Sequence, residues 1–511
     1  MRILLIDPPY KSFTGFANYY YPMGLASIAA CIRKAGHEAD VLDADAVFKG
    51  YDINFNEEYK RLELYRNGIN DNYHEVWRIL KKIISEYKPD IAGITVMTTK
   101  LASALKTAEI IKGINRQMPV LAGGPHASLD PGQLLDTGYV DIVIRGEGED
   151  TIRELLTVFK YRIKESDLLN DNYPVKYDQE ALKKINGISY NIKSKTIHNP
   201  DRELIKSLDD LPLPARNSLM FAGKYSSEDM GAIMCSRGCP FNCAYCCHPW
   251  GRQVRYRSVE NVLTEIKEVI DIYKTKQFEF KDDSFNVNKK WVLEFCGRII
   301  KDKIRINWGC TTRVDTLNDE ILREMKKAGC NIVKIGIETG SEKILEETNK
   351  GINFQQIIST AKLLNKHKIF WSGYFMVGLP NETREDIIKT CDFIRKINPY
   401  YAGLGVYNPF PGTALFDKGV EMGLLNPGVA VDHFFKTNPK DYYFIDPGVR
   451  LKNMNKDEFN EILDVMMKRF HKHNTQAKNL IRRAWARRMT YLSDRKIFIR
   501  DFSKAVKWIC T

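Results

Sequence analysis

Apolar runs and helical periods alternate along the first 160 residues of the chain. Short apolar runs, which are typical of buried strands, are separated by segments whose apolar residues recur every three or four positions, as in amphipathic helices. Strands separated by helices pair in parallel, so these residues are predicted to form a doubly wound α/β sheet of flavodoxin (Rossmann-like) type. The predicted strands are 2–7, 38–45, 90–97, 119–124 and 140–146.

Unusual residues follow four of these five strands, at the edge where a doubly wound sheet binds its ligands. They are residues 7–10 after the first strand, 95–99 at the end of the third, 123–126 after the fourth and 145–148 after the fifth. Glycine pairs allow a backbone to approach a ligand closely. Each turn on its own is explained as a tight strand-to-helix connection, but four such turns at one edge predict a binding pocket.

A second alternating region follows a polar stretch. Residues 161–223 are predicted to be a linker, with one hairpin strand at 185–190. Beyond the linker, six strand–helix units predict a partial (β/α)6 barrel over 224–420, with its functional residues at the carboxyl ends of the strands by analogy with full barrels. The first strand is the apolar run before Cys235, and the others are 277–283, 305–313, 331–338, 368–378 and 401–409.

Five of the eleven cysteines lie within the thirteen residues from Cys235 to Cys247. Cys239, Cys243 and Cys246 have the spacing C-x-x-x-C-x-x-C, with which one loop can wrap around an iron–sulfur cube. Three ligands for four irons leave one iron open to a substrate or cofactor. A structural zinc site is the alternative, but it requires four ligands and usually a second, distant C-x-x-C pair, which this sequence lacks.

This cysteine spacing closely resembles the signature of the radical SAM superfamily. The resemblance implies a 4Fe-4S cluster on Cys239, Cys243 and Cys246, with S-adenosyl-L-methionine on the open iron. Tyr245, just before the third cysteine, is then expected to pack near the adenine.

The resemblance also assigns carboxylates at two strand ends. Asp282 or Asp283, in FKDDSF, is expected to hold the amino group of S-adenosylmethionine, and Glu338, in GIETGSE, its ribose. The motif of the superfamily at the first of these positions contains glycines that FKDDSF lacks. Alternatively, a buried carboxylate at a strand end is structural and pairs with an arginine such as Arg313.

The N-terminal stretches DPPY, YPMGLASIAA, GGPHAS and RGEGE resemble the cobalamin-binding domain of cobalamin-dependent radical SAM enzymes. The resemblance implies that Thr95, Gly123, Gly124 and Glu147 contact cobalamin, and the fold argument places Tyr10 and its loop neighbours nearest the lower face of the cobalt. Domains of the methionine synthase type carry D-x-H-x-x-G with histidine on cobalt, whereas no histidine precedes His37 here. The resemblance therefore implies cobalamin without a histidine ligand from this loop, and a lone histidine in a turn, such as His126, is more often polar surface.

The resemblance covers nearly all of residues 1–420 and is greatest to the subgroup of anaerobic magnesium-protoporphyrin ester cyclases and class B radical SAM methyltransferases. It implies that a 5′-deoxyadenosyl radical activates an unactivated carbon or phosphorus centre, which then receives a methyl group from methylcobalamin. One alternative is a cobalamin-dependent cyclase or ring-rearranging enzyme without methyl transfer. Another is a non-catalytic cobalamin- or redox-sensing module. The resemblance further implies a small-molecule or peptide substrate and an electron donor such as flavodoxin or ferredoxin.

Composition indicates a soluble, cytoplasmic protein of two or three domains. Of its 511 residues, 44% are hydrophobic and 28% charged, and no apolar segment approaches the ~20 residues of a membrane span. The first ten residues reach Asp7 before any apolar run of signal-peptide length. Clustered thiols in the reducing cytoplasm bind metals rather than form disulfides.

The net charge of +13 is concentrated in residues 468–511, which hold thirteen Lys or Arg and two Asp. The preceding residues are nearly neutral, so no nucleic-acid partner is expected. Helices are predicted at 456–473 and 478–492 within a mainly helical region, 421–511. A basic amphipathic helix can be a solvated face, can contact an acidic partner, or can lie at the inner face of a membrane.

Overall fold

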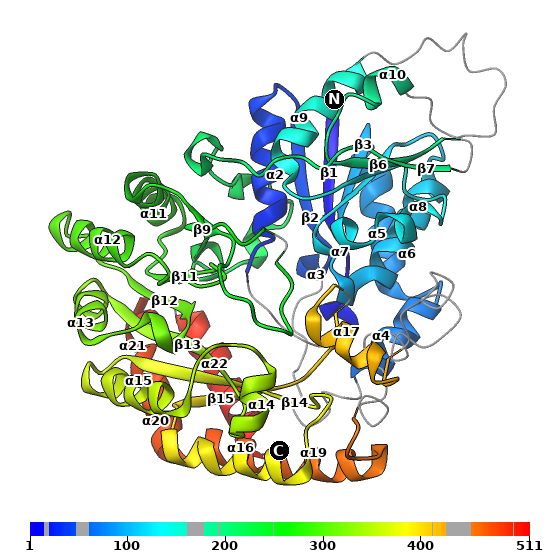
Figure 1. Cartoon of the computed structure of the whole chain (residues 1–511). Coiled ribbons are helices and arrows are strands. Elements are labelled where there is room, and N and C mark those ends of the chain that lie inside the picture. The colour runs from blue at the N-terminus through cyan, green and yellow to red at the C-terminus, as the bar shows by residue number, and fades with distance from the viewer. Residues whose placement is uncertain are drawn as a thin grey trace. The chain divides into compact units, whose positions relative to one another are not determined.

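The computed structural model of the chain describes all residues except 15–19, 48–60, 161–177, 193–194, 249, 411, 426–450, 494 and 511. The described residues divide into two compact units, the first ending at Ser226 and the second beginning at Ser227. Each unit is built on one β-sheet with helices packed against it (Figure 1).

The first unit contains a seven-stranded sheet in the order β2-β1-β3-β4-β5-β6-β7. Its first five strands are parallel, and their order confirms the predicted flavodoxin-type sheet. They are β1 (Arg2–Asp7), β2 (Glu38–Asp43), β3 (Ile91–Thr95), β4 (Val120–Gly123) and β5 (Ile142–Ile144). Four consecutive residues of β1, Ile3 to Ile6, are buried, because helices cover both faces of the sheet.

Helices α2 (Met23–Lys34) and α9 (Gly148–Lys160) pack together, as do α5 (Glu75–Tyr87) and α6 (Leu101–Ile114) (Figure 1). Shorter helices occupy the connections at the sheet edge and near α9. They are α1 (Lys11–Thr14), α3 (Ala44–Val47), α4 (Arg61–Asn70), α7 (Pro125–Leu129), α8 (Pro131–Leu135) and α10 (Gln179–Leu182).

Residues 161–177 of the predicted linker, 161–223, lie outside the described part of the chain, and the described part of the linker is more than a connector. Within it, β6 (Ile188–Ile192) and β7 (Lys195–His198) extend the sheet, with β6 antiparallel to β5. Ile188 and Tyr190 are buried beside the short strand β5. An added hairpin covers a sheet edge that would otherwise expose unpaired backbone groups, and this edge contact explains why a polar stretch forms strands.

The second unit contains six parallel strands in the order β15-β14-β13-β12-β11-β8, which confirms the predicted partial barrel. They are β8 (Ala232–Ile233), β11 (Gln277–Phe280), β12 (Asn307–Thr312), β13 (Cys330–Glu338), β14 (Phe370–Val377) and β15 (Tyr401–Val406). The helices between them are α11 (Val259–Tyr273), α12 (Lys289–Lys301), α13 (Asp319–Lys327), α15 (Phe354–Lys366) and α16 (Arg384–Ile397).

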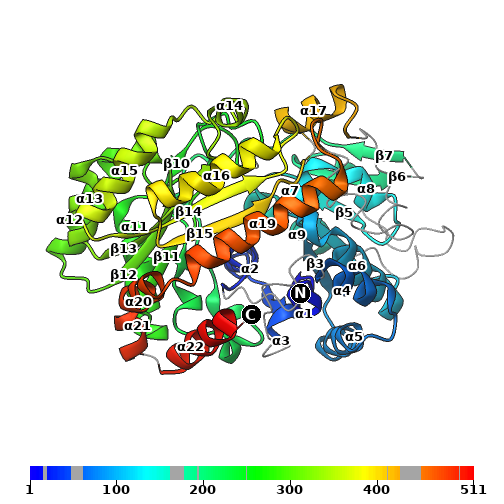
Figure 2. The same cartoon turned by 90° about the horizontal axis from the view of Figure 1, so that it is seen from below.

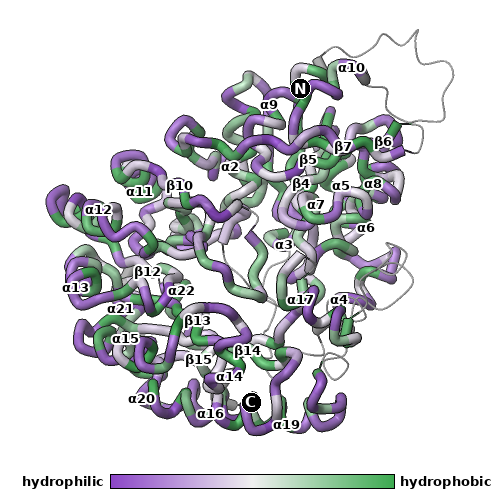
Figure 3. The backbone as a smooth tube through the Cα atoms, viewed as in Figure 1, coloured by the Kyte–Doolittle hydropathy of each residue, from purple (hydrophilic) through white to green (hydrophobic). Residues whose placement is uncertain are grey.

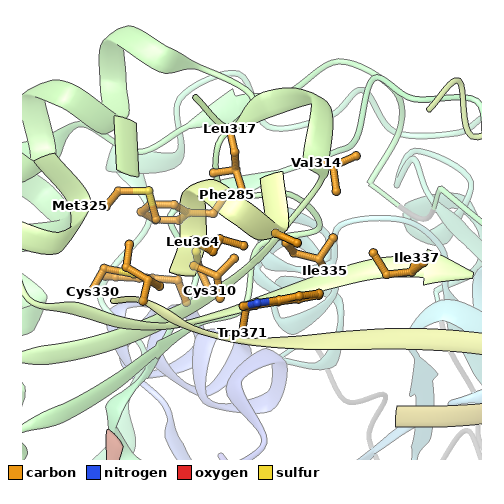
Figure 4. Packing of buried hydrophobic residues seen from close by; sticks show 14 of the residues in the cluster. Phe285, Cys310, Val314, Leu317, Met325, Cys330, Ile335, Ile337, Leu364 and Trp371 are labelled. Carbon is orange, nitrogen blue, oxygen red and sulfur yellow. The ribbon is translucent and has the colours of Figure 1, made fainter. Parts of the chain in front are cut away.

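A hydrophobic core lies between these strands and their helices. It includes Phe285, Cys310 and Trp371, which Figure 4 shows together with Ile335 and Ile337 of β13. Because side chains alternate along a strand, Lys334, Gly336 and Glu338 of β13 lie on the opposite, inner face of the sheet. The inner face therefore carries Lys334 and Glu338, the two charged residues of the strand.

The described part of the C-terminal region beyond residue 450 is mainly helical, as predicted, whereas residues 426–450 of that region lie outside the described residues. Helix α19 (Lys456–Asn474) buries Phe459, Ile462, Met466 and Phe470 and packs against α16 and β15 (Figure 2). The helix predicted at 478–492 is divided into α20 (Ala477–Ala486) and α21 (Arg488–Ser493), and α22 (Arg495–Cys510) follows. Figure 3 shows apolar stretches along the strands and polar stretches along many of the helices. Within the described ranges, no helix combines the length and the apolar character needed to cross a membrane.

Candidate functional site

The cysteine motif lies on a loop between two short antiparallel strands, β9 (Ser236–Arg237) and β10 (Arg255–Tyr256). The amide of Cys239 donates to the carbonyl of Gly251 across the loop (3.2 Å), and the amide of Cys246 donates to the carbonyl of Cys243 (3.1 Å). Gly238 has a positive φ of 97°, and a Cβ there would lie 2.3 Å from the carbonyl oxygen of Gln253. Only glycine fits where the two arms of the loop approach.

Backbone hydrogen bonds join this loop to the helices that follow the strands. The amide of Ala244 donates to the carbonyl of Thr348, directly after α14 (Glu342–Glu347), at 2.8 Å. In turn, the amide of Leu415, in α17 (Ala414–Glu421), donates to the carbonyl of Ala244, also at 2.8 Å. The loop is therefore held at the carboxyl end of the parallel strands.

The thiols of Cys239, Cys243 and Cys246 lie near one another. Burial, followed by the nearby thiols of Cys243 and Cys239, raises the pKa of Cys246 to about 12. Cys235 is fully buried in the hydrophobic core, and Cys247 is exposed. Across the described residues, no group of three or more His, Cys, Asp or Glu side chains is arranged to hold one metal ion. An iron–sulfur cube spreads its thiolates over separate irons, so a loop of three neighbouring thiols fits that donor set.

Arg313 connects the loop to the strand edge. Its guanidinium lies over the ring of Phe241 (3.7 Å to the centroid), and its Nη1 donates to the sulfur of Cys243 at 3.5 Å. It also forms a two-point ion pair with Asp315, at 2.9 and 2.8 Å. Arg313 is thus paired with Asp315, and Glu338 finds a different partner.

That partner is Lys350, a residue that the sequence reasoning missed. Glu338 ends β13 with a positive φ of 69°, and its Oε1 accepts hydrogen bonds from the Lys350 ammonium and from the Tyr245 hydroxyl (3.0 Å). All three side chains are largely buried, and burial together with Glu338 raises the pKa of Tyr245 well above its ordinary value. A Cβ on Gly336 would lie 2.2 Å from Oε1 of Glu338 and 2.5 Å from Nζ of Lys350, so this glycine provides the space for the pair.

The two aspartates of FKDDSF differ in burial and in the groups that they contact. Asp282 is buried, and its Oδ1 accepts hydrogen bonds from the amide of Cys235 (3.1 Å) and the hydroxyl of Ser236 (2.5 Å). Asp283 is exposed, and its charge contributes to the raised pKa values of Cys239 and Cys246. Asp283 therefore faces the cysteine loop, whereas Asp282 is tied to the start of that loop.

Buried acceptor atoms without a partner among the described residues gather at the same edge. They follow β11, β14 and β15 and are Oδ2 of Asp282, Oγ of Ser284, Oε1 of Glu382 and Oδ1 of Asn408. Buried polar atoms in folded proteins are nearly always hydrogen-bonded. This edge therefore fits a ligand with several donors, such as the ammonium and ribose hydroxyls of S-adenosylmethionine.

In the first unit, the carboxylate of Asp45 fixes the loop after β1. It accepts hydrogen bonds from the amides of Tyr10 (3.0 Å), Lys11 (3.0 Å) and Ser12 (2.8 Å) and from the Ser12 hydroxyl (2.6 Å). The Tyr10 ring packs against Tyr65 with a centroid distance of 4.9 Å. The placement of Tyr10 thus depends on Asp45, the last residue of the strand predicted at 38–45, which the structure places in α3.

The loops after β3 and β4 meet at Gly124. The amide of Val96 donates to the carbonyl of Gly123 (2.7 Å), and a Cβ on Gly124, which has a φ of 107°, would lie 3.1 Å from the hydroxyl oxygen of Thr95. A Cβ on Gly123 would meet nothing closer than 3.8 Å. Thr95, Gly123 and Gly124 are therefore brought together, and a Cβ on Gly123 would make only ordinary contacts with Ile144.

Two other residues of this sheet edge, Glu147 and His126, form hydrogen bonds with residues of the first unit. Glu147 is buried, and its Oε2 accepts a hydrogen bond from the amide of Ile205 (2.7 Å), so the structure gives it a structural contact besides the predicted cofactor role. His126 is buried, and its two ring nitrogens contact Thr98 (3.3 Å) and Gln133 (3.2 Å). Burial lowers the pKa of His126.

Comparisons with known proteins agree with this division of the chain. The B12 binding domain model matches residues 69–156, and the Radical SAM superfamily model matches residues 233–394. An uncharacterized methyltransferase of Pyrococcus horikoshii (PH0819) is 33% identical over 470 residues, which cover 91% of each chain. An anaerobic magnesium-protoporphyrin IX monomethyl ester cyclase of Rubrivivax gelatinosus is 28% identical over 481 residues, covering 92% of this chain and 77% of the relative.

Among solved structures, the radical S-adenosylmethionine methyltransferase TsrM of Kitasatospora setae, with tryptophan substrate and the analogue aza-SAM bound, matches with a TM-score of 0.62. The match covers 82% of this chain and 76% of TsrM at 17% identity. TsrM with cobalamin and a [4Fe-4S] cluster bound gives a TM-score of 0.61. At this identity the likeness shows a shared fold.

Replacing Gly336 by Ala is expected to displace the Glu338–Lys350 pair, because the new Cβ would occupy the position of its charged atoms. We expect the free energy of unfolding to fall by about 1–3 kcal/mol, as in other overpacked sites. Urea denaturation measures this free energy. The control is Gly297→Ala in α12, where a Cβ would meet nothing within 4 Å. Equal stability of the two variants would show that Gly336 does not provide this space.

Glu382 is expected to make stability depend on pH. Burial raises its pKa from 4.5 to about 8, although the amides of Gly378 and Leu379 donate to it. A raised carboxyl pKa contributes stability that is complete below about pH 4.5 and is lost as pH rises through about 8. The side chain of Glu382→Gln stays neutral at every pH. As pH rises from 5 to 8, urea denaturation should therefore show the stability of the variant increasing relative to that of the native chain. Exposed Glu385→Gln should show no such trend.

Proposed function

The chain belongs to the cobalamin-dependent radical SAM enzymes, the family of the Pyrococcus methyltransferase, and we propose that it transfers a methyl group to an unactivated carbon or phosphorus centre of a small molecule. The observation that carries this proposal is the cysteine loop held at the edge where Asp282, Glu338 and the other buried acceptors lie. A B12-binding domain in the same chain supports a methyl donor other than S-adenosylmethionine alone.

The enzyme uses a 4Fe-4S cluster, S-adenosyl-L-methionine and cobalamin. Together these groups supply a carbon-centred radical and a transferable methyl group, and the protein supplies their placement. The proposed cluster ligands are Cys239, Cys243 and Cys246. The proposed cobalamin contacts are Tyr10, Thr95, Gly123, Gly124 and Glu147.

Three residues, Asp282, Glu338 and Tyr245, are proposed to bind S-adenosylmethionine. Oδ2 of Asp282 is a buried acceptor suited to the ammonium, while Asp283 stays near the thiols. Glu338 is proposed to accept from the ribose hydroxyls, and its ion pair with Lys350 holds the carboxylate at this buried position. Tyr245 donates a hydrogen bond to Glu338 and packs against the apolar cluster that includes Leu379 and Tyr407, and its ring is proposed to pack near the adenine.

Arg313 is proposed to act on the thiolate of Cys243. Its Nη1 donates to that sulfur, and hydrogen bonds to ligand sulfurs alter the reduction potential of iron–sulfur clusters. The stacked ring of Phe241 and the pair with Asp315 hold the guanidinium in this orientation. Arg313 would thus position the charge beside one ligand without touching the substrate.

We place the enzyme in the cytoplasm and propose reduced flavodoxin or ferredoxin as its electron donor. The basic region 468–511 supports contact with an acidic partner or with the inner face of a membrane. The substrate is a small molecule, and a peptide is the wider alternative. TsrM, with its tryptophan substrate, supports the small-molecule class.

A cyclase without methyl transfer is the second candidate. The ester cyclase of Rubrivivax gelatinosus, which aligns with 92% of this chain, favours it. The two reactions differ in product mass and in the use of S-adenosylmethionine. Methyl transfer adds one CH₂ and consumes a second molecule of S-adenosylmethionine, whereas cyclisation does neither.

Anaerobically purified chain supplied with cobalamin is expected to contain about four irons and about one cobalt. Replacing Cys239, Cys243 and Cys246 together by Ala should remove the iron and leave the cobalt. The proposed cluster ligands lie in the second unit, whereas the proposed cobalamin contacts lie in the first. Cys247→Ala, a neighbouring exposed thiol, should keep the iron. Iron retained by the triple variant would contradict the ligand assignment, and iron without cobalt would contradict methylcobalamin as donor.

Product mass is expected to distinguish the two candidate reactions. With reductant, S-adenosylmethionine and porphyrin, indole or phosphonate compounds as test substrates, mass spectrometry should find a product heavier by one CH₂. S-adenosylhomocysteine and 5′-deoxyadenosine should form in equal amounts. 5′-Deoxyadenosine formed with a product of altered mass but no added CH₂ would favour cyclisation or rearrangement.

A further inference from the structure

Exposed apolar side chains are concentrated at the C-terminus of the second unit. Seven of the fourteen large hydrophobic residues that are exposed in the described parts of the chain lie between 481 and 506. These C-terminal apolar residues are Ile481, Trp485, Leu492, Phe498, Ile499, Phe502 and Val506, with Leu492 81% exposed. Single exposed hydrophobic residues are common on protein surfaces, but a concentration in three consecutive helices indicates an interaction site.

Helix α20 has its polar side turned inward. The guanidinium of Arg482 lies over the ring of Tyr400 (4.8 Å to the centroid), while Ile481 and Trp485 of the same helix are exposed. After the end of α20, Arg487 pairs with Glu228 (2.7 Å). A helix on a water-exposed surface normally shows the reverse arrangement, with apolar residues inward and arginines outward.

Helix α22 also exposes apolar side chains to the solvent. Ile497 is buried, whereas Phe498, Phe502 and Val506, which are spaced four residues apart, are exposed along one side. The rings of Phe498 and Phe502 stack with a centroid distance of 5.8 Å. The exposed residues of α22 therefore form a continuous aromatic and aliphatic stripe.

Basic residues accompany this apolar surface. Lys478, Arg488 and Arg495 are exposed, and Arg488 lies over the ring of Trp485 (4.3 Å to the centroid). Residues 468–511 contain thirteen Lys or Arg and two Asp. Aromatic and apolar side chains beside Lys and Arg are the combination that binds the boundary of an anionic lipid layer. A second copy of the chain would bring two strongly basic regions together, which charge repulsion opposes.

We infer that helices α20–α22 bind the surface of an anionic phospholipid membrane through the C-terminal apolar residues. Trp485, Phe498 and Phe502 enter the headgroup boundary, and Arg488 and Arg495 contact lipid phosphates. The enzyme lies on the membrane without spanning it. Such binding would bring the active chain to substrates of low water solubility and is independent of whether the reaction is methyl transfer.

Vesicle sedimentation tests this inference with the full chain and its cofactors. Vesicles of phosphatidylcholine containing about 30% phosphatidylglycerol should sediment the protein, and vesicles of phosphatidylcholine alone should not. NaCl at about 0.5 M should weaken binding, because it screens the basic side chains. Equal sedimentation with both vesicle types would overturn the inference.

Matched variants locate the binding surface. Phe498→Ser with Phe502→Ser should lower the partition constant about tenfold or more, because two apolar anchors are lost. Ile272→Ser with Ile300→Ser, two similarly exposed residues of α11 and α12, should leave it unchanged. Arg488→Gln with Arg495→Gln should weaken binding more than Lys290→Gln with Lys301→Gln, which removes the same charge from α12.

Two results would overturn the inference at this surface. One is equal vesicle binding by the Phe498/Phe502 and Ile272/Ile300 variants with unchanged circular dichroism. The other is a dimer, seen by light scattering without vesicle binding, that the Phe498/Phe502 variant abolishes. The second result would assign the C-terminal apolar residues to contact between two copies of the chain.

Discussion

The site of the second unit depends on one buried ion pair, between Glu338 and Lys350. Glu338 ends β13 in the left-handed φ region, which is unfavourable for a residue with a side chain and persists only where neighbours hold it. Lys350 and Tyr245 hold the carboxylate, and Gly336 leaves room for both charged groups. Because Tyr245 belongs to the cysteine loop, the same contact fixes the three thiols relative to the sheet. The cysteine loop and the strand ends therefore share these contacts, and a substitution in one should alter the conformation of the other.

The first unit orders its sheet edge in a related way. The carboxylate of Asp45 accepts from three consecutive amides, at positions 10–12, which would otherwise need water or a ligand. A carboxylate can do this because its two oxygens accept several hydrogen bonds at once. In each unit, then, a carboxylate at the sheet edge holds a loop that is expected to face a cofactor. The cofactors have demanding chemistry of their own, and the contribution of the chain is to hold such loops in one conformation.

The sequence predicted the two parallel sheets because alternating apolar runs and helical periods are local signals, and it located the cysteine loop because the spacing of its thiols is distinctive. It did not predict that β6 and β7 join the first sheet, since this pairing depends on the edge presented by β5 rather than on any pattern in 188–198. Lys350 carries no sequence signal, because its role arises only when a turn brings it beside Glu338. The role of Asp45 was not predicted for a different reason: it ends a predicted strand, and its partners are backbone amides some 35 residues away.

In the C-terminal helices, too, the sequence pattern predicted the elements but not their tertiary contacts. The sequence predicted a basic amphipathic helix at 478–492, but the pattern cannot say which side turns inward. The aromatic rings of Tyr400 and Tyr401 and the carboxylate of Glu228 decide this, because a guanidinium gains more from a ring face and a two-point carboxylate contact than from water alone. With Arg482, Arg483 and Arg487 held in this way, Ile481 and Trp485 are left exposed. An apolar surface exposed in this way is unfavourable in water, so its existence argues for a partner that the basic residues around it would attract.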